Sequence, residues 1–258
     1  MPADTLAEMV ELVSYVMIDR GSDGARSNNL LFTNAVIQQE VESALYQYSL
    51  DCPYQKTVDV TGTDSVFYKL NSLSGWIKDF SVIKQIEYPA IDPEENDQTD
   101  IPAYLTLDKE TDQYRKGADL FIRFLTVTPT TTETIRIDFT TYHALTTTAG
   151  DCTIPLHHQD ALAYLTAARL CKRKMAEHSE SGDSTMGVSL SEYRDATLRY
   201  RQAAEEFENQ YRRLVGLPLV HNGRINSKMA TTAAGSSINW DTSESSRRDW
   251  FVHLNRYR

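Results

Sequence analysis

The sequence predicts an α+β chain: a helical bundle with an inserted antiparallel β module and an extended C-terminal tail. Three observations lead to this prediction. Apolar residues recur at helical spacing near both ends of the first 217 residues, alternate with polar residues in between, and follow no period after Pro218. We therefore expect four parts. These are N-terminal helices over 1–54, the β-rich insert over 55–150, C-terminal helices that complete the bundle over 151–217, and the tail over 218–258.

Two helices are predicted in the N-terminal part. Thr5, followed three residues later by Glu8, matches a capping box, and the apolar spacing after it predicts a helix over residues 5–18. A second apolar stripe begins at Leu31. It predicts a helix that ends before Pro53, because proline disfavours helical geometry in the residue before it.

The insert shows the alternation that is typical of half-buried strands. It is clearest in residues 120–124 and 135–139, where every second residue is apolar. Between them, residues 128–133 surround Pro129 and predict a hairpin loop. The acidic, proline-containing segment 87–112 predicts a solvated excursion from the sheet.

Helical spacing returns after Pro155 and predicts a third helix that extends to His178. A Ser- and Gly-rich break over 179–189 separates it from a fourth helix that begins near Leu190. Apolar residues of this helix step by three or four positions, with charged residues on the other face. Gly216 is expected to end it, since glycine is the preferred residue just past a helix C-terminus.

Composition excludes several protein classes. The chain is 41% hydrophobic and 24% charged, as in ordinary folded proteins. Apolar runs such as 120–125 are far shorter than the roughly 20 residues that span a bilayer, so we expect no membrane contact. Residues 1–11 carry no basic residue, which argues against a secretory signal and predicts synthesis in the cytoplasm. The three cysteines, Cys52, Cys152 and Cys171, are widely spaced and odd in number, which predicts reduced thiols.

No motif indicates catalysis. The sequence contains no nucleotide-binding glycine loop, no nucleophile elbow and no zinc-protease helix pair. The concentrated histidines are His157 and His158, with His143 upstream. Adjacent residues on a helix point about 100° apart, so this pair alone is a poor chelator. We expect no enzymatic activity, no metal and no cofactor. The alternative is a metal-dependent hydrolase that uses His143, His157, His158 and nearby acids.

The C-terminal segment differs from the rest of the chain in charge. The net charge is −10, yet residues 222–258 carry six bases against three acids, or +3, so the remaining body is near −13. Aromatic residues and arginine are typical anchors of protein interfaces. The residues that we expect to contact a partner chain are Trp240, Arg247, Arg248, Trp250, Phe251, Tyr257 and Arg258. A mobile end, a segment folded onto its own body, and nucleic-acid binding are alternatives, although +3 is weak for the last.

Several segments resemble a known family. They are residues 76–89 (WIKDFSVIKQIEYP), Tyr104-Leu105, residues 137–145 (IDFTTYHAL), Thr153-Ile154-Pro155 before an alanine-rich helix, and the loop 182–186 (GDSTM) before a Tyr- and Arg-rich helix that closes at 214–217. Together they resemble the head-tail adaptor (connector or neck) proteins of tailed bacteriophages. The resemblance covers residues 34–217.

The resemblance implies a structural role in the virion neck. Such adaptors form a ring, commonly of twelve copies, below the portal protein, and a C-terminal extension often reaches the portal. The expected partners are other copies of the chain, the portal above, and a tail tube, nozzle or tail-completion protein below, with genomic DNA passing through. An acidic body would repel that DNA and limit sticking. Another virion structural or tail-completion protein is the alternative within the same class.

Overall fold

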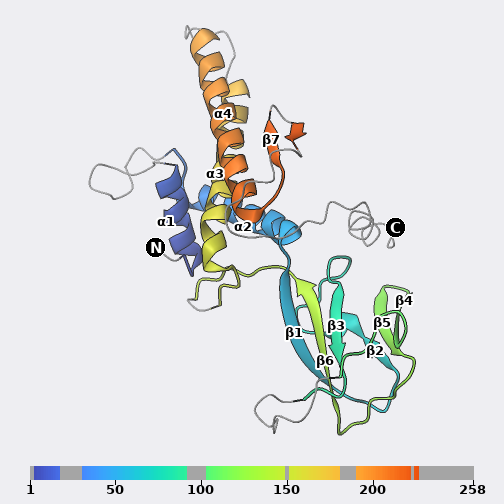
Figure 1. Ribbon diagram of the computed structural model, residues 1–258. Coiled ribbons are helices and arrows are strands. Elements are labelled where there is room, and N and C mark those ends of the chain that lie inside the picture. The colour runs from blue at the N-terminus through green and yellow to red at the C-terminus, as the bar shows by residue number, and fades with distance from the viewer. Residues whose placement is uncertain are drawn as a thin grey trace. The chain divides into compact units, whose positions relative to one another are not determined.

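A computed structural model of the chain divides it into two compact units (Figure 1). The helical unit contains the residues up to Cys52 and those from His143 onward, and the β unit contains residues 53–142. The structure describes residues 3–17, 31–91, 103–148, 151–180, 190–221 and 224–226. The predicted α+β class is confirmed.

The helical unit contains the four predicted helices. They are α1 (Leu6–Val16), α2 (Asn34–Asp51), α3 (Leu156–Glu180) and α4 (Leu190–Val215). The capping box at the start of α1 forms as expected: the Thr5 hydroxyl accepts from the Glu8 amide, and the Glu8 carboxylate accepts from the Thr5 amide. Thr33 caps α2 through a single hydrogen bond, which its hydroxyl accepts from the Val36 amide.

Helix α3 forms the centre of this unit, since α1, α2 and α4 all pack against it (Figure 1). Leu162 and Leu170 of α3 are fully buried together with Met9 of α1 and Tyr48 of α2. Burial of apolar area at these contacts stabilises the helices far more than their intrinsic propensity does.

The end of α4 has the predicted glycine. Gly216 has φ +79°, a conformation that glycine adopts without steric cost. The Leu217 amide donates to the Arg212 carbonyl at 2.7 Å, which satisfies a carbonyl at the helix end as in a Schellman motif.

Residues after Pro218 are not wholly without secondary structure, so this part of the tail prediction was wrong. Strands β7 (Leu219–His221) and β8 (Arg224–Asn226) pair antiparallel, with Leu219 opposite Asn226. An Asn-Gly dipeptide separates them in the sequence, and this dipeptide is a strong signal for a two-residue hairpin turn. Residues 227–258 lie outside the described part of the chain.

The β unit consists of two three-stranded antiparallel sheets. The first has the order β1 (Tyr54–Thr61), β6 (Thr134–Thr141) and β3 (Ile83–Glu87). The second has the order β2 (Phe67–Lys69), β5 (Asp119–Phe124) and β4 (Thr111–Lys116), and a short 3₁₀ helix, Leu70–Ser72, follows β2. The inner faces of both sheets share one core, in which Ile122 of β5 and Ile137 and Phe139 of β6 are fully buried.

The predicted hairpin between residues 120–124 and 135–139 is wrong. Strands β5 and β6 form at these positions but belong to different sheets, so the residues between them cross from one sheet to the other. The crossing packs on the loop after β1: the Gly62 amide donates to the Glu133 carbonyl at 2.9 Å. A Cβ at Gly62 would lie 1.9 Å from the Thr130 carbonyl oxygen, so only glycine permits this approach.

The acidic segment 87–112 returns to the sheet earlier than predicted. The Tyr88 amide donates to the Ala103 carbonyl, and the Leu105 amide donates to the Ile86 carbonyl, both at 2.9 Å. The apolar side chain of Leu105 packs against the β core, which explains the early return. Residues 92–102 of the predicted excursion lie outside the described part of the chain.

The β unit ends at Tyr142, whereas the sequence analysis placed the end of the insert at Gly150. Residues 143–148 belong to the helical unit because they bond to the segment before α3: the Thr153 amide donates to the Ala144 carbonyl at 3.1 Å. Among the described helices, none is long and apolar enough to cross a membrane.

Candidate functional site

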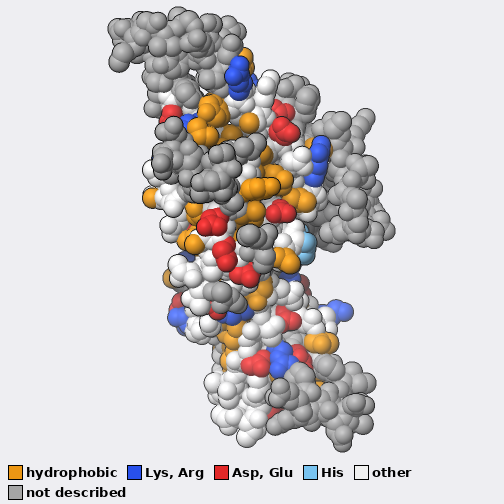
Figure 2. Space-filling model, turned by 90° about the vertical axis from the view of Figure 1, so that its left-hand side faces the viewer, with side chains coloured by type: hydrophobic (Ala, Val, Ile, Leu, Met, Phe, Trp, Pro, Cys, Tyr) orange, Lys and Arg blue, Asp and Glu red, His pale blue; other side chains and the backbone are white. Residues whose placement is uncertain are grey.

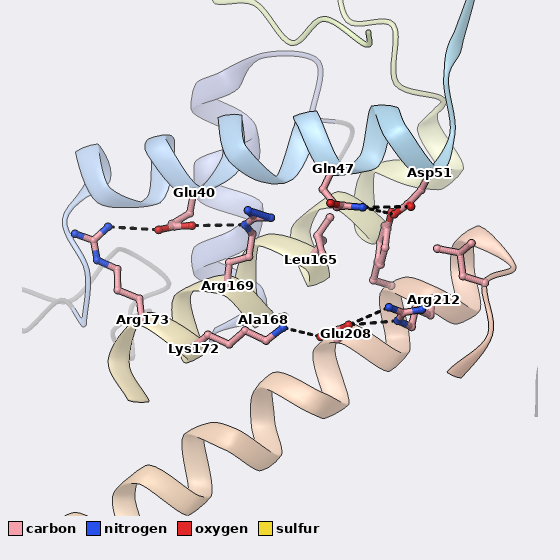
Figure 3. A pocket seen from close by; sticks show the side chains of 12 residues that line it. Glu40, Gln47, Asp51, Leu165, Ala168, Arg169, Lys172, Arg173, Glu208 and Arg212 are labelled. Carbon is pink, nitrogen blue, oxygen red and sulfur yellow. Dashed lines mark hydrogen bonds and ion pairs between the residues drawn. The ribbon is translucent and has the colours of Figure 1, made fainter. Parts of the chain in front are cut away.

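The helical unit has a surface cleft of about 640 Å³ between α2, α3 and α4 (Figure 3). Apolar side chains of Leu165, Ala168 and Leu217 line part of it. The polar and charged lining residues are Glu40, Gln47, Asp51, Arg169, Lys172, Arg173, Glu208, Tyr211 and Arg212. The α3 residues are spaced by three or four positions, so they share one face of that helix.

Glu40 of α2 bridges two arginines of α3 (Figure 3). Its carboxylate lies 3.7 Å from Arg169 Nε and 3.4 Å from Arg173 Nη1. Arg169 also donates to the Ser43 hydroxyl of α2 at 2.7 Å. These contacts join α2 to α3 along one side of the cleft.

Glu208 of α4 makes an equivalent bridge. Its carboxylate lies 2.7 Å from Lys172 Nζ and 3.2 Å from Arg212 Nη2. Burial raises the pKa of the Glu208 carboxyl, but hydrogen bonds and charge from Lys172, and then from Arg212, outweigh burial and hold the pKa below its usual value. Arg212 also donates to the Pro218 carbonyl at 3.1 Å, which ties the end of α4 to the segment leading into β7.

The third acid of the cleft, Asp51, has neutral partners. It accepts a hydrogen bond from the Tyr211 hydroxyl at 2.5 Å and from the Gln47 amide at 3.3 Å. Tyr211 is buried, and burial together with the Asp51 hydrogen bond raises the pKa of its hydroxyl far above the usual value. The cleft thus combines an apolar strip with ionic groups that are paired with one another.

A second polar cluster contains two of the three predicted histidines. The Tyr48 hydroxyl lies 2.6 Å from His158 Nδ1, and the Tyr48 and His143 rings are 4.9 Å apart. His143 Nε2 lies 2.9 Å from the Cys52 carbonyl, and its Nδ1 lies 3.0 Å from the Thr153 carbonyl. His143 therefore joins the end of α2 to the segment before α3.

Burial sets the ionisation of this cluster. It lowers the pKa of His143, and hydrogen bonds to Thr153 and Cys52 oppose the effect in part. Burial, and then the charges of His157 and His143, lower the pKa of His158. Burial likewise raises the pKa of the Tyr48 hydroxyl far above its usual value. These groups are therefore neutral near pH 7.

The histidines do not assemble into a metal site in the described part of the chain. His157 is exposed at the start of α3, and its ring contacts His158 edge to face at 4.3 Å. Both ring nitrogens of His143 face backbone carbonyl oxygens. Across the described residues, no group of three or more His, Cys, Asp or Glu side chains is placed to hold a metal ion. The described residues thus supply no set of metal ligands for the hydrolase alternative.

All three cysteines are free thiols, as the sequence predicted. Burial raises the pKa of Cys171 to about 11, and burial followed by the charge of Asp51 raises that of Cys52 to about 11. Burial also raises the pKa of Cys152. Thiols with such values are almost entirely protonated near pH 7 and are poor nucleophiles.

The predicted partner-binding residues of the tail, Trp240 to Arg258, lie outside the described part of the chain and remain a prediction. The cleft, conversely, was not among the sites predicted from the sequence. The i,i+4 pair Glu208 and Arg212 was visible as a charged helix face, but Glu40 and Arg173 are 133 residues apart. No local pattern predicts that second contact.

Figure 2 shows one face of the molecule, on which acidic, basic and apolar side chains are intermixed. The described side chains on this face form no broad basic surface of the kind that tracks a phosphate backbone. The nucleic-acid alternative concerned the C-terminal segment, of which residues 227–258 lie outside the described part of the chain.

Comparisons with known proteins give a weak structural likeness. No protein-family model matches the chain, and no curated protein matches it. Among solved structures, the chain is similar to a chain in the neck of an empty GTA particle computed with C6 symmetry. The match covers 75% of this chain and 88% of that chain, with 13% sequence identity and a TM-score of 0.26. At this TM-score the likeness carries no argument about function.

Proposed function

We propose that this chain is a structural head-tail adaptor of a tailed bacteriophage, a ring component of the virion neck that joins the portal to tail components and lets DNA pass. One observation carries the proposal: the segments that resemble adaptor proteins form the framework of both units. Segment 76–89 leads into and includes β3, segment 137–145 contains the end of β6 and the chain's return to the helical unit, and 153–155 precedes α3.

Contacts within these segments have a structural character. The Trp76 and Phe139 rings pack with centroids 5.2 Å apart in the β core. The Tyr88 hydroxyl donates to the Glu133 carboxylate at 2.5 Å and so ties β3 to the crossing between the two sheets. In segment 137–145, Ile137 and Phe139 are fully buried, and the two ring nitrogens of His143 lie 2.9 Å from the Cys52 carbonyl and 3.1 Å from the Thr153 hydroxyl. A resemblance carried by framework residues supports a shared architecture.

A binding role rather than catalysis fits the polar groups of the helical unit. The carboxylates of Glu40 and Glu208 are each shared by two cations, and the buried thiols are protonated near pH 7. A general acid, base or nucleophile needs a pKa near the working pH. The charged groups of the cleft are instead paired with one another, a structural arrangement that supports an adaptor without catalytic activity.

The portal is the proposed partner of the C-terminal tail. Its aromatic residues and arginines are interface types, and its charge of +3 contrasts with the acidic body. We propose that Trp240, Trp250, Phe251 and Arg247 anchor the tail to the portal.

Portal binding by two forms of the chain tests the proposal. A truncation after Asn226 keeps β7 and β8, whereas a cut after Val220 would divide the hairpin. We expect the truncated chain to keep its thermal melting temperature and to lose portal binding in a co-sedimentation assay. A full-length chain in which residues 227–258 are replaced by a Gly/Ser segment of equal length controls for chain length. Failure of the intact chain to bind the portal would contradict the adaptor role, and binding that survives truncation would contradict the role of the tail.

A further inference from the structure

The outer face of the β2-β5-β4 sheet carries aromatic side chains. Register places Phe67 opposite Arg123, and Tyr114 opposite Phe121. The Tyr114 and Phe121 rings stack with centroids 5.5 Å apart, and the Phe67 ring meets Tyr114 edge to face at 5.9 Å. The Arg123 guanidinium lies 5.7 Å from the Phe67 centroid. We name this surface the aromatic face.

These aromatics point away from the core. Their neighbours in the strands, Tyr68 and Ile122, are buried in the core between the sheets, so the alternating residues Phe67 and Arg123 face outward. Cross-strand aromatic pairs stabilise a sheet, but that contact leaves Phe67 45% exposed. Exposed aromatics beside arginine are the residue types that anchor protein interfaces.

The outer face of the β1-β6-β3 sheet is acidic. Register aligns Asp59 and Glu87 on either side of Arg136, with Asp138 on the same face. Arg136 donates to Asp59 at 2.9 and 3.1 Å and to Glu87 at 3.3 Å, and Asp138 accepts from the Thr57 hydroxyl at 2.6 Å. Two carboxylates thus contact one guanidinium, and of these Glu87 is buried. We name this surface the acidic face.

The charges of the two faces differ in sign. On the aromatic face the bases Lys69, Lys116 and Arg123 outnumber the acids Asp112 and Asp119, and Lys69 pairs with Asp119 at 2.8 Å. On the acidic face the acids outnumber the base. Because the inner faces of the two sheets share one core, the two outer faces point in opposite directions.

We propose that the aromatic face of one copy binds the acidic face of the next copy, head to tail. A heterologous contact of this kind needs two different, complementary patches on each subunit, and repetition of the contact builds a ring or a filament. Opposite faces of one rigid β core meet that requirement. This inference rests on the proposed function and deepens it, because it assigns the surface through which copies join.

Charge reversal and mixing test the proposal directly. Arg123→Glu spoils the aromatic face and leaves the acidic face intact, whereas Asp138→Lys does the reverse. Each variant alone should associate at least about tenfold more weakly than the wild type in sedimentation velocity. In an equimolar mixture the two variants can alternate along the array. The reversed aromatic face of Arg123→Glu then meets the reversed acidic face of Asp138→Lys, and the two native faces meet each other. The mixture should therefore recover oligomers. Variants that associate like the wild type, or a mixture that stays dissociated, would overturn the proposal.

A second pair of variants guards against misfolding. Phe67→Ser removes the exposed aromatic side chain, and Tyr46→Ser removes an exposed aromatic of the helical unit that belongs to neither face; Tyr46 is 52% exposed. With matching circular dichroism spectra, Phe67→Ser should weaken association and Tyr46→Ser should not. A wild-type chain that stays monomeric at its highest soluble concentration would overturn this inference while leaving the portal-binding test of the proposed function unaffected.

Discussion

Two buried tyrosines of the helical unit differ in their surroundings from an exposed phenylalanine of the β unit. In the helical unit Tyr48 and Tyr211 are buried, and their hydroxyls bond to His158 and Asp51. In the β unit Phe67 lies on an outer face, 45% exposed. A buried hydroxyl that forms a hydrogen bond contributes to folding stability, whereas an exposed aromatic side chain becomes buried only when another molecule binds to it.

Charged side chains show the same contrast. In the helical unit Glu40 and Glu208 are each shared between cations of the same cleft. In the β unit, Arg136 pairs with Asp59 and Glu87, and Lys69 pairs with Asp119, but the two outer faces keep net charges of opposite sign. The comparison teaches that the charges of the cleft are paired within the helical unit, while the β unit has outer faces of opposite net charge. Substitutions in the first should alter stability, and substitutions on the outer faces of the second should alter association.

Core truncation should have the largest effect and tests whether the units are separate. Leu162→Ala in the helical unit and Ile137→Ala in the β unit each remove a fully buried side chain. Each should lower the free energy of unfolding by about 2–5 kcal/mol. Hydrogen exchange should show that each variant loses protection mainly in its own unit. Equal loss in both units after either substitution would contradict the division into two units.

Loss of a buried hydroxyl should have the next largest effect. Tyr211→Phe leaves Asp51 without its 2.5 Å hydrogen bond and should lower the free energy of unfolding by about 1–3 kcal/mol in a denaturant titration. Tyr104→Phe, at an exposed position, is the control and should change stability by less than about 0.5 kcal/mol. Equal effects of the two substitutions would remove the basis for the contrast between buried and exposed aromatics.

The buried histidines should give the helical unit a pH dependence. Burial lowers the pKa of both His143 and His158 in the folded chain, whereas an unfolded histidine titrates near about 6.5. Below that pH the unfolded chain binds more protons, so the free energy of unfolding falls as the pH falls and is unaffected by these groups at higher pH.

Denaturant titrations between about pH 7.5 and about pH 5 measure this dependence. His143→Gln should reduce its slope, and His157→Gln, at an exposed position, should retain most of it. The opposite result would be a free energy of unfolding that increases as the pH falls through this range. If His143→Gln abolished that increase, the folded state would favour the charged imidazole.

Ion pairs of the cleft should have the smallest effect. Glu208→Gln removes the acid shared by Lys172 and Arg212, and Glu40→Gln is the matched variant for Arg169 and Arg173. Such partly exposed pairs contribute about 0.2–1 kcal/mol, and salt screens them. Each variant should therefore melt close to the wild type, with a difference that shrinks in high salt. A loss above about 2 kcal/mol would mean that the cleft is a major source of stability.

Local signals predicted the helices well. The Thr5 and Glu8 pair marked the start of α1, Pro53 lies just beyond the end of α2, and Gly216 marked the end of α4. Each signal acts within one turn of helix, so a single stretch of sequence contains it. The hairpin of β7 and β8 also had a local signal, the Asn-Gly dipeptide, which the search for periodicity passed over.

Strand pairing could not be predicted in the same way. Alternation predicted that residues 120–124 and 135–139 are strands, but Ile137 pairs with Val58 of β1, far away in the sequence. Strand β4 was missed because its sequence, TDQYRK, contains one aromatic residue and no apolar alternation. The cleft and the two outer faces depend on such distant pairings, so they were beyond the reach of periodicity and motif analysis.

A three-dimensional reconstruction of the neck in particles made from the genome that encodes this chain tests the central claim most directly. The adaptor role predicts a ring of density between portal and tail into which both units fit, with the C-terminal segment against the portal. Absence of the chain from the particle, or its location anywhere but the neck, would contradict the account.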